Sequence, residues 1–291
     1  MSETINAPTE VADFVDRATA PGSPAYLPTL FAPDEHRVRL GVAFALRGEI
    51  GRSLVPDLAP EVASTRLSWW GEEAGRVVAG APRHPLTSYL AGAIDTSALS
   101  DPRGLGVLIA EMVGAAQATL SEPVPANWSA LLHRMTHDWG AICRLMSRLF
   151  ASPSEREATW IEPWANALGV ACAIDEAIAA TADEGLPPLS PDDTVPSDSQ
   201  ARVATWRGHA VASLHTAATA IPADARPSQR PLLVLASLVH RRSSSGKDGA
   251  SSPHLARSLG ELWCAWRSAQ RAARGQLPTG LHGAPTVDSR P

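Results

Sequence analysis

Two histidines four residues apart, His133 and His137, form the pair in this sequence whose spacing could hold a metal ion. Residues four apart lie on one face of a helix, so both rings could reach one cation. The metalloprotease pattern also requires a glutamate directly after the first histidine, where this sequence has Arg134. We therefore expect no metal site here and interpret both histidines as the polar flank of a helix.

Two glycine-containing stretches begin like catalytic loops but lack essential residues. Gly246-Lys247-Asp248 has no Ser or Thr after the lysine and no first glycine at the spacing of a phosphate-binding loop. The stretch 51–55, GRSLV, lacks the second glycine of a nucleophile elbow, and the sequence predicts no sheet to hold one. Neither motif supports a Ser-His-Asp hydrolase or a phosphate-loop enzyme.

The cysteines and tryptophans favour structural roles. Cys143, Cys172 and Cys264 are an odd number set far apart in apolar helical patterns, which indicates buried thiols in a reducing compartment. Trp69 and Trp70 are adjacent, so on a helix they point about 100° apart. We expect one of these two to pack in the core, while the other lines a cavity.

The elements that must position these residues are helices throughout. Apolar residues recur at helical spacing, and no stretch shows the alternation of a strand. One face of the second long helix is expected to be buried through Leu67, Trp70, Ala74 and Val77. The predicted helices cover residues 36–55, 60–79, 104–120, 128–149, 155–183, 198–220, 228–241 and 254–274.

Composition is that of an ordinary globular protein, with 44% hydrophobic and 19% charged residues among 291. A net charge of -5 argues against nucleic-acid binding. The first residues lack a secretory signal and no apolar run is long enough to span a membrane, so we expect a cytoplasmic protein. We expect a flexible segment over 1–24, one all-α domain over 25–278 and a flexible tail over 279–291.

The segment from Pro60 to Leu90, PEVASTRLSWWGEEAGRVVAGAPRHPLTSYL, resembles a helix and turn of the squalene/phytoene synthase family. The shared features are Arg-Leu-x-Trp-Trp, an acidic pair and the ending Gly-x-Pro-x-His-Pro. Weaker similarity extends over residues 25–278, including MTHDWGAICRLMSRLF and the stretch ALGVACAIDEAIAATADEGLPPLS from Ala167.

The resemblance implies an isoprenoid-synthase-like helical bundle around a central apolar cavity. It also implies a reaction, in which two prenyl diphosphates are joined head to head after Mg²⁺-assisted loss of diphosphate. Magnesium prefers carboxylate and phosphate oxygens in octahedral array. Aspartates four apart on each of two facing helices would supply them.

This sequence departs from the family at those positions. The first acidic motif falls on Gly51, Arg52 and Val55, none of which is a carboxylate, and Glu49 lies roughly 160° around the helix from Gly51. The second motif is half kept, since its positions fall on Glu176 and Ala180, and then on the acidic pair 183–184. The candidate catalytic carboxylates are therefore Asp183, Glu184 and Glu176.

Two arginines near the lost motif offer a different chemistry. Arg47 and Arg52 could hold a diphosphate directly as a fork of donors, or both could lie on the solvated face of the helix. The residues expected to line the cavity or bind diphosphate are Arg47, Gly51, Arg52, Val55, Arg66, Trp69 and Glu73.

Three functions compete. The first is a member of the family that has lost prenyl transfer, needs no cofactor, and binds an isoprenoid or lipid or assists assembly of a membrane complex. Its loss of carboxylates resembles a branch related to phytoene-synthase-like complex I assembly factors, which implies a possible peripheral position at the inner face of the membrane. The second is an active Mg²⁺-dependent prenyltransferase that condenses two prenyl diphosphates. The third is a helical adaptor without a ligand.

Overall fold

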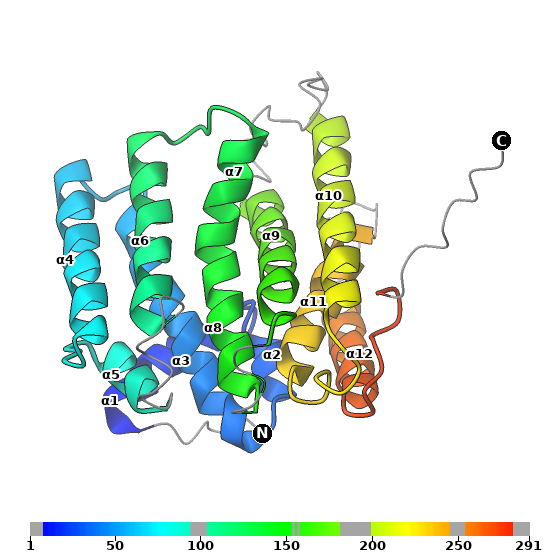
Figure 1. Cartoon of the computed structure of the whole chain (residues 1–291). Coiled ribbons are helices and arrows are strands. Elements are labelled where there is room, and N and C mark those ends of the chain that lie inside the picture. Colours follow the sequence, from blue (N-terminus) through cyan, green and yellow to red (C-terminus); the bar gives the residue numbers. More distant parts are fainter. Residues whose placement is uncertain are drawn as a thin grey trace.

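The protein is an all-α bundle, shown in Figure 1. Long helices run side by side, and shorter helices lie at the lower end of the bundle in that view. No β-strand occurs in the part of the chain that the structure describes. The computed structural model describes residues 8–93, 104–152, 155, 158–180, 199–244 and 254–281, with no side-chain description for 254–257.

The described part of the chain is built from helices that follow one another in sequence. Within the described residues, the α-helices are accompanied by a 3₁₀ turn η1 (Arg52–Leu54) and a π-helical turn η3 (Thr136–Gly140). The α-helices are α1 (Thr9–Ala18), α2 (Tyr26–Leu30), α3 (Asp34–Gly51), α4 (Pro60–Val78), α5 (Pro85–Ala93), α6 (Leu105–Ser121), α7 (Trp128–Met135), α8 (Ala141–Phe150), α9 (Ile161–Ala180), α10 (Ser199–Ala220), α11 (Arg230–Ser244) and α12 (His254–Ala272).

Helix α4 confirms the prediction made for its buried face. Leu67, Trp70, Ala74 and Val77 are all buried, because their spacing places them on one side of the helix toward the core. Its first residue is Pro60, whose missing N–H falls where a helix has no internal acceptor.

The predicted helix over 128–149 is one helical column that contains a π-helical turn. Asn127 begins it, because its side-chain oxygen accepts a hydrogen bond from the backbone of Ala130 at 2.9 Å. The column then passes through η3 before it continues as α8. Apolar periodicity predicts the length of such a column but gives no sign of one residue added to a turn.

The N-terminal region and helix α9 differ from the sequence-based prediction. Part of the segment 1–24 expected to be flexible forms α1, and its Val11 and Val15 are buried against α3. Isolated helices of this length are marginal, so tertiary packing stabilises α1, and sequence propensity alone does not predict it. Helix α9 begins at Ile161 instead of 155, because residues 159–160 form a turn before it.

Polar side chains tie the long helices together inside the bundle. Arg144 of α8 is buried and donates hydrogen bonds to Asn166 of α9 and Glu111 of α6. Arg242 of α11 forms a two-point ion pair with Asp175 of α9, with Nη2 2.6 Å from Oδ2. These pairs fix the helices around α9. None of the helices in the described ranges is long and apolar enough to cross a membrane.

Candidate functional site

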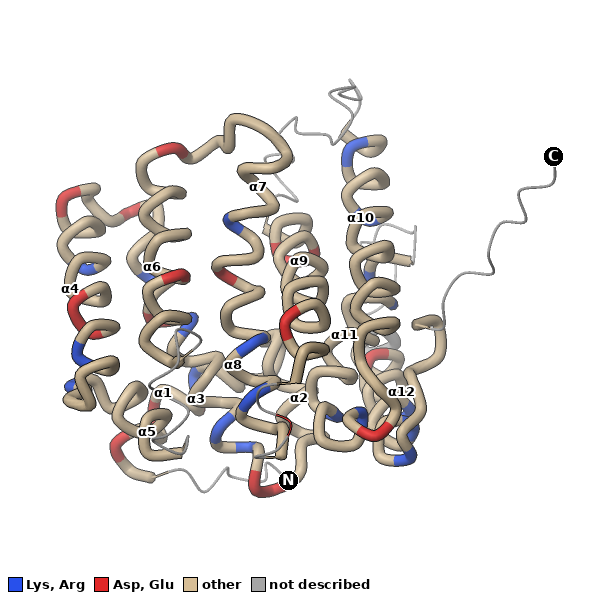
Figure 2. Tube along the Cα trace, viewed as in Figure 1, with Lys and Arg blue, Asp and Glu red and all other residues tan. Residues whose placement is uncertain are grey.

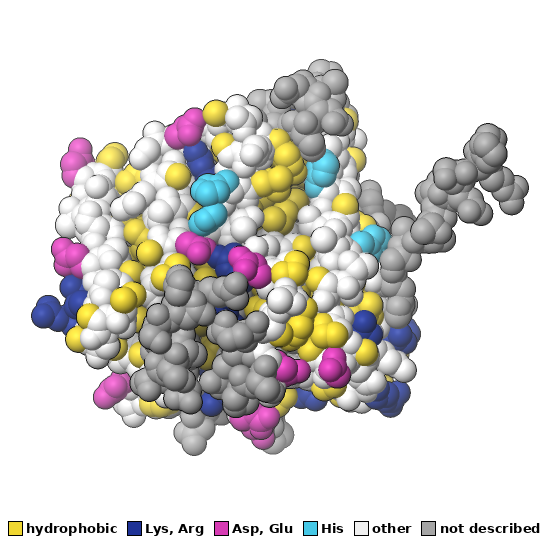
Figure 3. Space-filling view, viewed as in Figure 1, with side chains coloured by type: hydrophobic (Ala, Val, Ile, Leu, Met, Phe, Trp, Pro, Cys, Tyr) yellow, Lys and Arg dark blue, Asp and Glu magenta, His cyan; other side chains and the backbone are white. Residues whose placement is uncertain are grey.

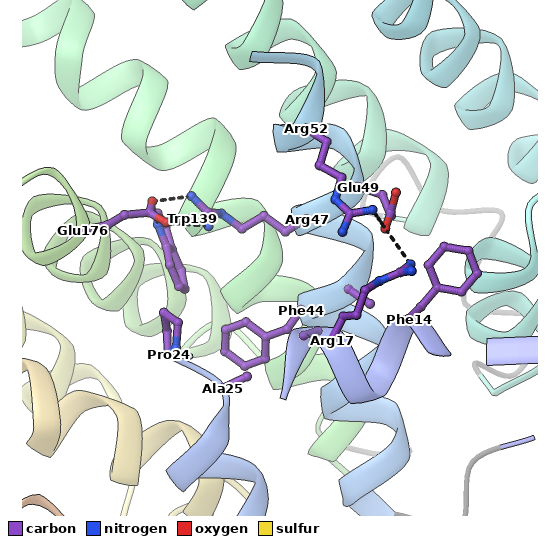
Figure 4. Close-up of a pocket in the computed structure, with 13 residues that line it drawn as sticks. Phe14, Arg17, Pro24, Ala25, Phe44, Arg47, Glu49, Arg52, Trp139 and Glu176 are labelled. Atoms are coloured by element: carbon purple, nitrogen blue, oxygen red, sulfur yellow. Dashed lines mark hydrogen bonds and ion pairs between the residues drawn. The ribbon is translucent and has the colours of Figure 1, made fainter. Parts of the chain in front are cut away.

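A pocket opens between α1, α3, η3 and α9 (Figure 4). Its volume is about 220 Å³. Aromatic and small side chains form its apolar wall, and charged side chains stand at two sides of it. The lining residues are Phe14, Arg17, Ala18, Pro24, Ala25, Phe44, Ala45, Arg47, Gly48, Glu49, Arg52, Trp139 and Glu176.

On one side of the pocket, Arg47 of α3 binds two carboxylates at once. Its Nη2 lies 2.6 Å from Asp138 Oδ2 and 2.6 Å from Glu176 Oε2. Its guanidinium also lies 4.0 Å from the centre of a Trp139 ring, and the Trp139 indole N–H donates to Glu176 Oε2 at 2.7 Å. The four side chains therefore form one cluster, the Arg47 cluster, which joins α3, η3 and α9.

Close contact between η3 and α9 sets the position of this cluster. A Cβ on Gly169 would lie 2.4 Å from the backbone nitrogen of Gly140, so only glycine permits this approach. Asp138 and Trp139 precede Gly140 directly in the π-helical turn, while Glu176 lies two turns beyond Gly169 on α9. The pair of glycines thus brings the acidic side chains within reach of Arg47.

On the other side of the pocket, Glu49 joins two arginines from different elements. Its Oε1 lies 3.3 Å from Arg17 Nη2 of α1 and 2.9 Å from Arg52 Nη1 of η1. Glu49 is largely covered, with 17% of its side chain exposed, whereas Arg17 and Arg52 are about half exposed, at 51% and 47%. This group, the Glu49 cluster, carries one more positive than negative charge.

The two clusters give the pocket opposite charge excesses at its two sides. The Arg47 cluster has one arginine against two carboxylates, and the Glu49 cluster has the reverse. Burial alone would raise the pKa of Glu176, but Arg47 and the indole of Trp139 outweigh it and lower that pKa. Burial would lower the pKa of Arg47, and Asp138 and Glu176 outweigh it, so Arg47 stays charged. Arg47 and Glu176 therefore form an ion pair at neutral pH.

Three of the site residues expected from the sequence meet at this pocket, namely Arg47, Arg52 and Glu176. The alternative that both arginines lie on a solvated face does not hold for Arg47, which has 18% of its side chain exposed and two acidic partners. Arg52 stands at the rim, half exposed and bound to Glu49. Figure 3 shows acidic and basic side chains adjoining at the centre of the face drawn.

The remaining cavity candidates lie elsewhere. Gly51 ends α3 in an exposed position, and Val55 is 46% exposed beyond η1. Arg66 is exposed and donates a hydrogen bond to the backbone oxygen of Arg52, at 3.4 Å. Trp69 is 40% exposed on the outside of α4, so neither of the adjacent tryptophans lines this pocket.

Glu73 is fully buried and has a structural role in place of a site role. Its Oε1 accepts hydrogen bonds from the backbone of Arg83 and His84 and from the hydroxyl of Thr87, at 2.8, 2.9 and 2.6 Å. Its Oε2 accepts from Arg76 Nε at 2.7 Å. Glu73 thereby satisfies the free N–H groups where α5 begins and fixes α5 to α4.

The predicted acidic pair, Asp183 and Glu184, lies outside the described residues.

The two histidines singled out by their spacing, His133 and His137, lie close together, with ring centroids 3.9 Å apart. Histidine side chains adjoin over α7 in Figure 3. Within the described ranges, no three His, Cys, Asp or Glu side chains gather as a metal-binding group.

Ten of the thirteen lining residues were not expected from the sequence, and the aromatic and charged ones among these ten are Phe14, Arg17, Phe44, Glu49 and Trp139. Phe14 and Arg17 were hidden by the interpretation of the N-terminal segment as flexible. Trp139 lies within the predicted helix over 128–149, where its acidic neighbour Asp138 was a sign that a polar group meets that part of the helix. No family model, curated protein or solved structure matches this chain.

Proposed function

We propose that this protein is a member of the squalene/phytoene synthase family that has lost head-to-head prenyl transfer and binds an isoprenoid or lipid in the pocket beside Arg47. The observation that carries the proposal is the pairing of Arg47 with both Asp138 and Glu176. An arginine there takes the place of the cation that a magnesium-dependent reaction would need.

Electrostatic repulsion disfavours magnesium at this pocket. Like unit charges about 4 Å apart repel by roughly 4 kcal/mol at an effective dielectric constant near 20, and Mg²⁺ carries two. The carboxylates of Glu49, Asp138 and Glu176 each already face an arginine. A magnesium ion would have to displace a guanidinium that makes two-point hydrogen bonds, and it would then lie beside a free positive charge.

The shape and polarity of the pocket support an amphipathic ligand. Phe44 and Trp139 meet edge to face, with ring centroids 6.0 Å apart, and together with Ala25 they offer an apolar wall. A volume of about 220 Å³ equals that of roughly seven water molecules, enough for a polar head and the first carbons of a chain. The half-exposed Arg17 and Arg52 could hold a phosphate oxygen at the rim.

A turnover and extraction experiment tests the proposal. The purified protein is incubated with farnesyl or geranylgeranyl diphosphate and Mg²⁺, and released diphosphate is measured. We expect no release above a protein-free control, and we expect solvent extraction of the purified protein to recover a bound isoprenoid or lipid. Steady release of diphosphate would contradict the loss of prenyl transfer. Failure to recover any lipid, with no rise in melting temperature on adding prenyl diphosphate, would favour the helical adaptor.

Paired variants locate the binding site. Replacing Arg17 and Arg52 together with alanine should weaken binding of farnesyl diphosphate in EDTA by at least about tenfold, because each charged hydrogen bond contributes about 1.5–3 kcal/mol. Arg83→Ala is the matched control, since Arg83 is exposed and only its backbone makes a hydrogen bond to Glu73. Equal losses in both proteins would place the ligand elsewhere.

A further inference from the structure

Helix α12 turns its small residues inward and its large apolar residues outward. Ala265 and Ala269 pack against Val234 and Leu238 of α11, next to α2. On the opposite side, four large apolar residues are exposed. They are Leu259 (64%), Leu262 (40%), Trp263 (58%) and Trp266 (44%). We name this set the α12 stripe.

The α12 stripe is continuous along the helix. Its members occupy positions i, i+3, i+4 and i+7, which fall on one side of a helix. Trp263 and Trp266 stack on each other, with ring centroids 4.9 Å apart and planes 26° apart. Helix α12 lies at the outer edge of the bundle, where, among the described elements, α11 and α2 pack most closely against it (Figure 1). A contiguous apolar surface of this kind marks a docking site.

The charged residues along the stripe are mostly basic. Residues 258–281 contain 3 Lys and Arg and 1 Asp and Glu, a net charge of +2, whereas the whole chain carries -5. Arg267 lies one turn beyond Trp263 and is exposed, and Arg274 is exposed in the turn after the helix. The acidic Glu261 lies toward α11, 3.8 Å from Arg242. Figure 2 shows basic residues gathered at the lower end of α12.

We propose that the α12 stripe lies on an anionic lipid surface, with Trp263 and Trp266 in the headgroup region and Arg267 and Arg274 against lipid phosphates. Tryptophan prefers the boundary between headgroups and acyl chains, and an apolar stripe flanked by arginines is the pattern of a helix that lies in that plane. No exposed carboxylate interrupts the face within residues 258–281. No described residue of α12 lines the pocket beside Arg47, so lipid contact at the stripe does not depend on a ligand in that pocket.

Vesicle binding tests it. The full-length protein is mixed with vesicles of phosphatidylcholine alone, or of phosphatidylcholine with phosphatidylglycerol, and the sedimented fraction is measured. We expect binding to the mixed vesicles that is at least about tenfold stronger than to the neutral ones and that weakens as salt rises, because each arginine near an anionic surface contributes about 1 kcal/mol. Binding to neither kind of vesicle, or to both equally, would overturn the proposal.

Surface variants separate the stripe from the rest of the protein. Replacing Trp263 and Trp266 together with serine should lower binding at least about tenfold, and Arg267→Glu with Arg274→Glu should abolish the preference for phosphatidylglycerol. Trp69→Ser is the matched control, because Trp69 is 40% exposed on α4 at the opposite edge of the bundle (Figure 1). Light scattering completes the test: a wild-type dimer that becomes a monomer on replacing both stripe tryptophans would show that a second copy covers the stripe instead.

Discussion

Arg47 of α3 and Glu176 of α9 stand 129 residues apart in the chain and form a two-point ion pair, with Nη1–Oε1 and Nη2–Oε2 distances of 3.1 and 2.6 Å. Asp138 completes the group from η3. One guanidinium thus pairs with the carboxylates of two elements and holds α3, η3 and α9 around the pocket.

Removing Arg47 should weaken the fold and free its two carboxylates. Arg47→Ala is expected to lower the free energy of unfolding by about 1–3 kcal/mol, less than for a fully buried pair because Asp138 and Glu176 are 36% and 46% exposed. The unpaired carboxylates should also bind Mg²⁺ weakly where the wild type does not. Urea unfolding and calorimetric titration measure the two effects. Arg47→Lys, which keeps the charge, should not bind Mg²⁺; metal binding equal in all three proteins would contradict this account of the cluster.

Glu73 should make stability depend on acid pH. Burial would raise its pKa, but hydrogen bonds from His84, Thr87, Arg76 and Arg83 outweigh it and lower the pKa to about 2. A carboxyl group whose pKa is lower in the folded than in the unfolded state stabilises the protein at pH values above the unfolded-state pKa. This contribution is lost as the pH falls toward the folded-state pKa.

The pH test compares the wild type with Glu73→Gln. The difference in free energy of unfolding between the wild type and this variant should shrink by roughly 2 kcal/mol as the pH falls from about 6 to about 3. Urea unfolding at each pH measures it. A difference between the two proteins that stays constant over this range would mean that the Glu73 carboxylate does not stabilise α5.

The two adjacent tryptophans of α4 should contribute unequally to the free energy of unfolding. Trp70 is 5% exposed in the core, so Trp70→Ala should cost about 3–5 kcal/mol of unfolding free energy. Trp69 is 40% exposed, so Trp69→Ala should cost about 1 kcal/mol or less. Thermal or chemical unfolding of the two variants is the measurement. Similar losses would show that the face of α4 assigned to the core is misplaced.

The close approach of η3 to α9 predicts a glycine effect. Gly169→Ala would press a methyl group onto the backbone of Gly140 and should cost about 1–3 kcal/mol, while it also moves the Arg47 cluster. Gly71→Ala on α4 meets nothing within 4 Å and should stabilise the protein by about 0.5–1 kcal/mol. The melting temperatures of both variants test this prediction. An unchanged melting temperature for Gly169→Ala would contradict the tight contact between Gly169 and Gly140.

Sequence reasoning predicted the long helices because each has an apolar face that repeats at helical spacing, as at Leu67 and Trp70 of α4. The short helix α1 was not predicted, because a helix of this length is stable only when Val11 and Val15 pack against α3. The sequence predicted some of the pocket residues but not their arrangement. Arg47 and Glu176 were candidates, but their pairing depends on a π-helical turn and on a glycine contact between distant helices. Neither feature produces a periodic pattern in the sequence.

The most direct test of the central claim is a calorimetric titration with a non-hydrolysable farnesyl diphosphate analogue, with Mg²⁺ and with EDTA. The account predicts binding of similar affinity in both conditions, and a loss of at least about tenfold when Arg17 and Arg52 are both replaced with alanine. Binding that requires Mg²⁺ and disappears when Asp183 and Glu184 are replaced with alanine would contradict it, because the metal-dependent chemistry of a prenyltransferase would then survive.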